Sequence, residues 1–295
     1  MLVNLRDICA IAEQNNMAIA AFNTPSLEAV RAAIGAAEAT GYPVIIQHAE
    51  CHENIAPLDV IGPAMVALAE RSTAQICVHL DHGENLSYIR RALEMGFTGV
   101  MLDGSALPYE ENVAMSARAA AMCANFDCGL ECELGSLGAR EGDVLHGGDT
   151  PAGGTGATYT DPDQAREFLD ATGADLLACS FGTVHGLYRG EPHLSFEVLE
   201  QIRERVPRAA LVMHGGSGVS NEDYHKAIDA GIRKINYYTY GVKYAGESVA
   251  ELVDARRTAG TQVYWHDMTI AAYERLLADF TDVMKVFANG AAPLA

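Results

Sequence analysis

Hydrophobic and polar positions along the chain form two kinds of segment. Short runs that are apolar almost throughout are separated by longer stretches in which apolar residues recur at helical spacing. Apolar runs without strict alternation are typical of parallel strands that are buried on both faces. The strands predicted in this way cover residues 18–23, 43–47, 76–81, 99–103, 128–133, 176–181, 210–214 and 234–238.

The stretches between these runs are predicted to be amphipathic helices. Four of the helices are followed by a glycine, which is a common C-terminal cap because glycine adopts the left-handed conformation without strain. These helices cover residues 26–40, 86–95, 161–172 and 221–230, and the glycines are Gly41, Gly96, Gly173 and Gly231.

The regular alternation of strands and helices predicts the fold. Eight strands alternating with helices over about 240 residues fit a (β/α)8 TIM barrel, a fold of the α/β class. A doubly wound open sheet is the alternative arrangement of the same elements. No Pro/Ser-rich linker divides the chain. We therefore expect a single barrel domain over residues 1–295, with residues 241–295 as a C-terminal helical extension.

Composition narrows the class of protein. The net charge is −19, and so negative a surface repels nucleic acid and anionic membranes. The seven cysteines are odd in number and show no CxxC spacing, so we expect reduced thiols and a cytoplasmic location. The N-terminus does not read as a signal peptide, and no apolar run reaches the ~20 residues that a membrane span needs.

Three of the predicted strands lead into a histidine that is followed by glycine: His82, His185 and His214. The C-terminal ends of barrel strands meet at one face, so these imidazoles would converge there. Three imidazoles with open coordination positions suit a catalytic zinc ion. Taken singly, each histidine could instead be a hydrogen-bonded polar residue at a strand end. His79 is expected to point into the barrel core and receives no role.

Five motifs resemble those of a known family. They are Leu80-Asp81-His82-Gly83, Gly182-Thr-Val-His185-Gly186, His214-Gly-Gly-Ser217-Gly218, Val100-Met-Leu-Asp103-Gly-Ser105 and Glu131-Cys-Glu133-Leu-Gly135. Together they make the chain, from about residue 5 to residue 240, resemble the class II, metal-dependent fructose-bisphosphate and tagatose-bisphosphate aldolases. The resemblance implies that the three histidines bind Zn²⁺. It also implies that a ketose 1-phosphate or 1,6-bisphosphate is reversibly cleaved to dihydroxyacetone phosphate and an aldehyde.

The resemblance also assigns the acids and bases. Asp81 matches the catalytic acid/base, and its place beside a metal ligand suits removal of the C4 hydroxyl proton during cleavage through a metal-stabilised enediolate. Glu141 matches the acid of a mobile lid, within a glycine-rich loop over residues 135–159, although it could be only a solvated loop charge. Glu133 and Asp103 are expected beside the metal ligands or as alternate ligands.

A phosphate site is expected at the ends of the sixth, seventh and eighth strands, where backbone N–H groups and hydroxyls can approach an anion. The glycines there could instead be ordinary turn residues. By resemblance, a Na⁺ or K⁺ ion could accompany the phosphate. The predicted substrate-binding residues are Asn23, Gly186, Gly215, Gly216, Ser217, Asn236, Tyr238 and Thr239.

Three departures from the family pattern concern the substrate. Two tyrosines stand in Asn236-Tyr237-Tyr238-Thr239, where the family has small or acidic residues, and His48-Ala49 replaces a common serine at the second strand end. No arginine matches the one that binds the distal phosphate of bisphosphates. We therefore expect that the phosphate at C1 is retained and that the aldehyde half is altered and need not be phosphorylated.

Two other functions fit the same motifs. A metal-dependent epimerase or lyase of the same fold would work without cleaving the C3–C4 bond of a ketose phosphate, and a non-catalytic homologue would only bind a sugar phosphate. By resemblance, the protein is expected to be a homodimer or homotetramer. The apolar stretch 270–287 could form that interface or pack on its own barrel.

Overall fold

The computed structural model describes residues 1–135, 158–186 and 192–294. Eight parallel strands follow one another around a closed barrel, and β8 pairs with β1 to complete it. The predicted (β/α)8 barrel is therefore confirmed, and the open-sheet alternative is wrong. The strands are β1 (Ile19–Asn23), β2 (Val44–Ala49), β3 (Ile76–Gly83), β4 (Gly99–Leu102), β5 (Gly129–Leu134), β6 (Leu176–Cys179), β7 (Ala210–Met213) and β8 (Ile232–Tyr237).

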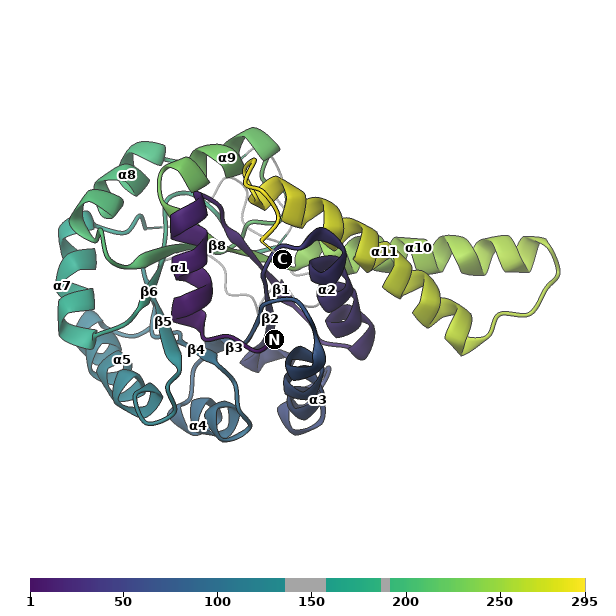
Figure 1. Ribbon diagram of the computed structural model, residues 1–295, viewed down its shortest axis with the longest axis horizontal. Coiled ribbons are helices and arrows are strands. Elements are labelled where there is room, and N and C mark those ends of the chain that lie inside the picture. Colours follow the sequence, from purple (N-terminus) through teal and green to yellow (C-terminus); the bar gives the residue numbers. More distant parts are fainter. Residues whose placement is uncertain (136–157, 187–191, 295) are drawn as a thin grey trace.

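Helices surround the barrel, as Figure 1 shows. Their N-termini are capped by short polar side chains where the sequence offers them: Ser26 Oγ accepts a hydrogen bond from Ala29 N, and Asp161 Oδ1 accepts one from Gln164 N. The helices are α1 (Leu5–Asn15), α2 (Leu27–Thr40), α3 (Leu58–Arg71), α4 (Leu86–Glu94), α5 (Tyr109–Cys123), α7 (Pro162–Thr172), α8 (Phe196–Arg205), α9 (Asn221–Asp229), α10 (Thr239–Thr258) and α11 (Trp265–Phe287), with a 3₁₀ turn η1 (Glu50–His52).

The prediction that four helices are followed by a glycine in the left-handed conformation is confirmed. Gly41, Gly96, Gly173 and Gly231 have φ values of 71°, 95°, 73° and 111°. Each glycine reverses the chain after a helix and starts it toward the next strand, so a residue with a side chain would be strained at these positions. The repeated use of this turn sets the spacing of the βα units.

Two apolar clusters hold these layers together. The larger one lies between the strands and the surrounding helices, and the smaller one includes Leu5, Ile8 and Ala12 of α1 with barrel residues such as Ile19. Helix α1 thereby covers the end of the barrel where the strands begin, and it lies across that end in Figure 1. The opposite end, where the strands stop, is left for polar side chains.

The last two helices form a hairpin that extends away from the barrel (Figure 1). The second half of α11 returns to the barrel, where Phe280 stacks on Phe22 of β1 with ring centroids 3.9 Å apart. Leu276, Met284 and Phe287 are buried there as well. The apolar stretch 270–287 therefore packs partly on its own barrel.

All seven cysteines lie in the described residues, and none is in a disulfide. None of the helices in those residues combines the length and apolar character that a membrane span requires.

Candidate active site

The end of β3 makes an irregular turn that positions His82. His82 has φ 42°, an uncommon value for a residue with a side chain, and the register with β4 shifts between Leu80 and Gly83. A Cβ on Gly83 would lie 2.7 Å from the carbonyl oxygen of Met101, so only glycine fits. The backbone of His82 and Gly83 therefore turns sharply at the end of a buried strand and directs the imidazole to one side. Strained backbone of this kind is often found at functional sites.

The three predicted histidines converge at the C-terminal end of the barrel. The ring centroid of His82 lies 5.0 Å from that of His185 and 4.7 Å from that of His214, and the last two are 5.7 Å apart. One ring nitrogen from each lies within 4.8 Å of the other two, and all three residues are buried. Three clustered imidazoles fit a divalent cation that needs bonds of about 2.0–2.1 Å.

Carboxylates fix the orientation of two of these rings. His82 Nδ1 lies 2.9 Å from Asp103 Oδ2, so Nε2 is the nitrogen that a metal could take. His214 Nε2 lies 2.9 Å from Glu131 Oε1, so Nδ1 is the corresponding nitrogen, and Glu133 Oε2 is 3.2 Å from it. Such carboxylate partners set the tautomer and basicity of metal-binding histidines. Asp103 and Glu133 thus lie beside the histidines, as the sequence predicts.

The electrostatics of this network favour charged carboxylates. Burial alone would raise the pKa of Glu131, but the Lys234 ammonium and the hydrogen bond to His214 outweigh it and lower the pKa to about 2. Burial alone would lower the pKa of His214, but its hydrogen bonds to Glu131 and Glu133 raise the pKa to about 9. A cation bound at Nδ1 of His214 would displace the proton from that nitrogen and leave the hydrogen bond from Nε2 to Glu131 in place.

Asp81 is fully buried and held by three side-chain amides. Asn23 Nδ2 and Gln47 Nε2 donate to Oδ2 at 3.0 and 3.1 Å, and Asn236 Nδ2 donates to Oδ1 at 3.1 Å. Burial alone would raise the pKa of Asp81, but His82 and other nearby positive groups hold the pKa well below its usual range. The carboxylate is therefore ionised and oriented, which is what a base beside a metal site requires.

The predicted substrate-binding residues line one pocket together with His185. Gly215 has φ 62°, and a Cβ there would lie 2.3 Å from the carbonyl oxygen of Val184, so glycine is required. Helix α10 begins at Thr239, and the N-terminus of a helix favours anions. No lysine or arginine among the described residues lines this pocket. Its lining is Asn23, His185, Gly186, Gly215, Gly216, Ser217, Asn236, Tyr238 and Thr239.

The sequence places both Tyr237 and Tyr238 beside the substrate, and for Tyr237 this expectation is wrong. Tyr238 lines the pocket, but Tyr237 points to the outer face of β8, where its ring meets Phe22 edge-on at 6.1 Å. Successive side chains of a strand point to opposite faces, so only one of the two could face the pocket. The ring of His52 packs against Tyr238 with centroids 4.9 Å apart.

The predicted lid acid Glu141 lies outside the described residues. The sequence reasoning overlooked Gln47, Glu131 and Lys234, which lie in the barrel among the predicted site residues. A signal for them exists, because charged or amide residues two positions apart in an apolar strand share a face. Glu131 precedes Glu133 in this way, and Lys234 precedes Asn236.

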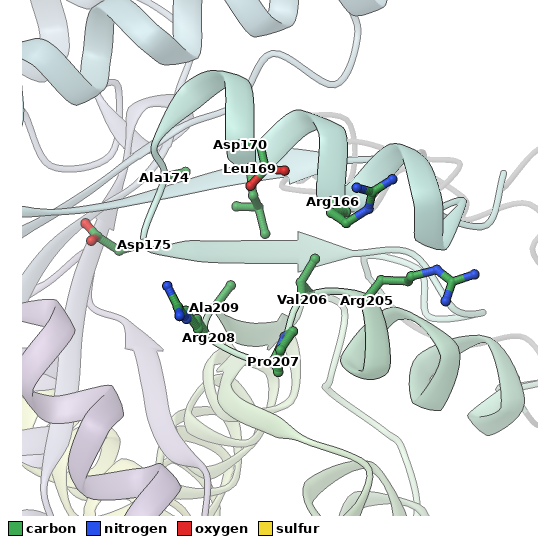
Figure 2. A pocket seen from close by; sticks show the side chains of 10 residues that line it. All are labelled: Arg166, Leu169, Asp170, Ala174, Asp175, Arg205, Val206, Pro207, Arg208 and Ala209. Atoms are coloured by element: carbon green, nitrogen blue, oxygen red, sulfur yellow. The ribbon is translucent and has the colours of Figure 1, made fainter.

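A separate pocket of about 480 Å³ lies on the outside of the barrel, between α7 and α8. Figure 2 shows Arg166 and Arg205 on one side of it and Arg208 near Asp175 on the other. Arg205 Nε pairs with Asp163 Oδ1 at 2.7 Å, and these side chains are 50% and 63% exposed. The pocket therefore offers surface charges, without the buried imidazoles and carboxylates of the C-terminal end.

Comparisons with known proteins match nearly the full chain. The family model described as "Fructose-bisphosphate aldolase class-II" matches residues 3–289. A probable fructose-bisphosphate aldolase from Bacillus subtilis is 34% identical over 258 residues, which cover 86% of this chain and 87% of the relative. The crystal structure of the YdjI aldolase from Escherichia coli is 30% identical with a TM-score of 0.84, covering 98% of this chain and 99% of that one. A putative fructose-1,6-biphosphate aldolase from Coccidioides immitis is 26% identical with a TM-score of 0.82, covering 97% of both chains.

Proposed function

The chain belongs to the class II fructose-bisphosphate aldolase family, and from this premise we propose that it reversibly cleaves a ketose 1-phosphate into dihydroxyacetone phosphate and an aldehyde. The observation that carries the proposal is the meeting of His82, His185 and His214 beside the buried carboxylate of Asp81.

We assign Asp81 as the base that removes the proton of the C4 hydroxyl when the C3–C4 bond breaks. Its carboxylate is ionised and held by three amide donors, so it can accept a proton without rotating away from the substrate. His82, His185 and His214 would hold a zinc ion, which when bound supplies a Lewis acid for the ketone oxygen. In the direction of synthesis, Asp81 returns the proton to the new C4 oxygen.

The phosphate at C1 is assigned to the pocket that Gly215, Gly216 and Ser217 form with the start of α10. Backbone N–H groups, a hydroxyl and the helix terminus would replace lysine and arginine as anion donors there. We propose that the distal end of the substrate is unphosphorylated, since the chain offers no match for the family's distal arginine. Accompanying Na⁺ or K⁺ binding belongs to the same proposal.

The remaining assignments follow from the family resemblance. Glu141 is proposed as the lid acid that exchanges the proton at C3 of dihydroxyacetone phosphate. A homodimer or homotetramer and a cytoplasmic location are proposed on the same basis, the second supported by seven reduced cysteines.

Proton exchange at C3 of dihydroxyacetone phosphate tests the proposed function without knowledge of the aldehyde. The exchange is followed by NMR in D2O with zinc-loaded protein, with chelator-treated protein and with Asp81→Ala. We expect stereospecific exchange that needs the metal. Absence of exchange in protein that demonstrably binds zinc would contradict the aldolase assignment and favour a binding protein.

A substrate panel tests the proposed distal end. We expect kcat/KM for ketose 1-phosphates to exceed that for fructose and tagatose 1,6-bisphosphates. A clear preference for either bisphosphate would show that the distal phosphate is recognised. Conversion of a ketose phosphate without cleavage of a carbon–carbon bond would instead indicate an epimerase.

A further inference from the structure

Lys234 is a lysine with no exposure to solvent, placed inside the barrel on β8. Its Nζ donates hydrogen bonds to Glu131 Oε1 at 3.2 Å and to Asn236 Oδ1 at 2.7 Å, and it lies 2.9 Å from Glu131 Oε2. An ammonium group has three protons to donate and can accept none. The three oxygens that it contacts belong to two side chains, and each of these side chains contacts a different part of the proposed active site.

The first connection runs through Glu131 to a proposed metal ligand. Glu131 Oε1 is 2.9 Å from His214 Nε2, so the carboxylate accepts the proton of that nitrogen and leaves Nδ1 for the metal. His79 Nε2 lies 3.5 Å from the other oxygen, Glu131 Oε2. Lys234 contacts both oxygens and thereby fixes the plane of the carboxylate that selects the tautomer of His214.

The second connection runs through Asn236 to the proposed base. An amide side chain has one acceptor end and one donor end, and the two ends can exchange places by rotation. Because Lys234 can only donate, the oxygen of Asn236 must face it. The amide nitrogen then faces Asp81 Oδ1, to which it donates at 3.1 Å. The reversed amide would set an oxygen against a carboxylate, which is repulsive.

We propose that Lys234 is a positioning residue that orients the metal ligand His214 and the base Asp81 together. This inference rests on the proposed function, since it concerns the metal and the base assigned there. Loss of the ammonium group would leave Asn236 held only through Asp81, and it would remove the cation that contacts both oxygens of Glu131. The imidazole of His214 and the carboxylate of Asp81 would then lose their fixed geometry.

The test replaces Lys234 by methionine, which has similar length and no charge, and uses Lys243→Met as the matched control. Lys243 is a surface lysine of α10, 41% exposed and paired with Glu247. Because Lys234→Met leaves the buried carboxylate of Glu131 without its lysine partner, the double variant Glu131→Gln/Lys234→Met is measured in parallel. The readouts are the zinc Kd from competition with a chelator, the visible spectrum of the cobalt-loaded protein, and kcat and KM.

Both variants at Lys234 are expected to weaken zinc binding by about 10- to 100-fold, as loss of a partner behind a metal ligand does. Their cobalt spectra should shift, and kcat should fall by at least about tenfold with KM changed far less, because Gly215, Gly216 and Ser217 of the phosphate pocket are unchanged. Lys243→Met should match the wild type.

Two results would overturn the inference. One is a folded Lys234 variant, single or double, with the wild-type zinc Kd and cobalt spectrum, because lower thermal stability alone would mean that Lys234 only supports the fold. The other is a wild-type protein that binds no zinc, which would also remove the proposed function. The measurements therefore distinguish failure of the positioning role from failure of the function.

Discussion

The inside of the barrel and the outer surface between α7 and α8 carry ionisable groups in opposite ways. Inside the barrel, behind the proposed metal ligands, Lys234 and Glu131 have no exposed side-chain surface and lie 2.9 Å apart. Between α7 and α8, Arg205 and Asp163 pair at a similar distance of 2.7 Å but are 50% and 63% exposed. The pocket beside this pair has a volume of about 480 Å³, and three arginines are among its lining residues (Figure 2). A short ion-pair distance or a large pocket therefore does not by itself identify the candidate active site of this protein.

The two regions differ in how deeply the charged groups are buried and in how many hydrogen-bond partners they share. A buried charge is costly unless every partner is in place, so a buried network keeps its groups in one arrangement. An exposed pair is solvated and contributes little. At the C-terminal end, the side chains of several strands share partners, from Asp103 and His82 across to Glu131 and Lys234. The comparison teaches that a change in the buried network should alter binding and catalysis, whereas a change in the exposed pair should be nearly silent.

The largest effect is expected from loss of a proposed metal ligand. His185→Ala should weaken zinc binding by more than about 100-fold, because even loss of a partner behind a ligand costs 10- to 100-fold. Titration calorimetry or chelator competition measures the change. His266→Ala is the matched control, since His266 is exposed on α11. Unchanged zinc affinity in folded His185→Ala would place the metal elsewhere and remove the contrast between the two regions.

A smaller effect is expected from the backbone of the phosphate pocket. Gly215→Ala should lower the free energy of unfolding by about 1–3 kcal/mol, because its φ of 62° and the nearby Val184 carbonyl exclude a Cβ. Denaturant unfolding measures the change. Gly246 in α10 has no neighbouring atom within 4 Å of the position that a Cβ would take, so Gly246→Ala should instead stabilise by about 0.5–1 kcal/mol. Equal effects of the two substitutions would contradict the constraint at Gly215.

The smallest effect is expected at the pocket between α7 and α8. Arg205→Ala removes an exposed ion pair, which is worth about 0–1 kcal/mol. Zinc affinity and the rate of C3 proton exchange should stay at wild-type values in the same preparation. A large loss of either would mean that this pocket communicates with the buried network, and the contrast between the two regions would be wrong.

The sequence predicts the strands and the strand-end histidines well because each depends on local pattern. Buried parallel strands read as apolar runs, and the residues that follow them must lie at one end of the barrel. The convergence of His82, His185 and His214 could therefore be predicted from their positions in the chain. The glycines that follow His82 and His214 are required by close backbone approaches, to Met101 of β4 and to Val184 in the segment after β6.

The connections between strands could not be predicted in the same way. Glu131 and Lys234 lie 103 positions apart in the chain, and their contact depends on the geometry of the closed barrel. Which side of the sheet the rings of Tyr237 and Tyr238 point to depends on the residue at which β8 ends. An apolar pattern locates that residue only approximately. Ring orientation depends on such partners too, so the sequence alone did not show which nitrogen of His214 faces Glu131.

Anomalous X-ray diffraction at the zinc edge, from crystals of zinc-loaded protein, tests most directly whether the C-terminal end holds the metal. We predict one strong peak between His82 Nε2, His185 and His214 Nδ1, with Asp81 beside it. A strong peak at any other place in the molecule, or none at these histidines when zinc is fully loaded, would contradict the assignment of the metal to this end of the barrel.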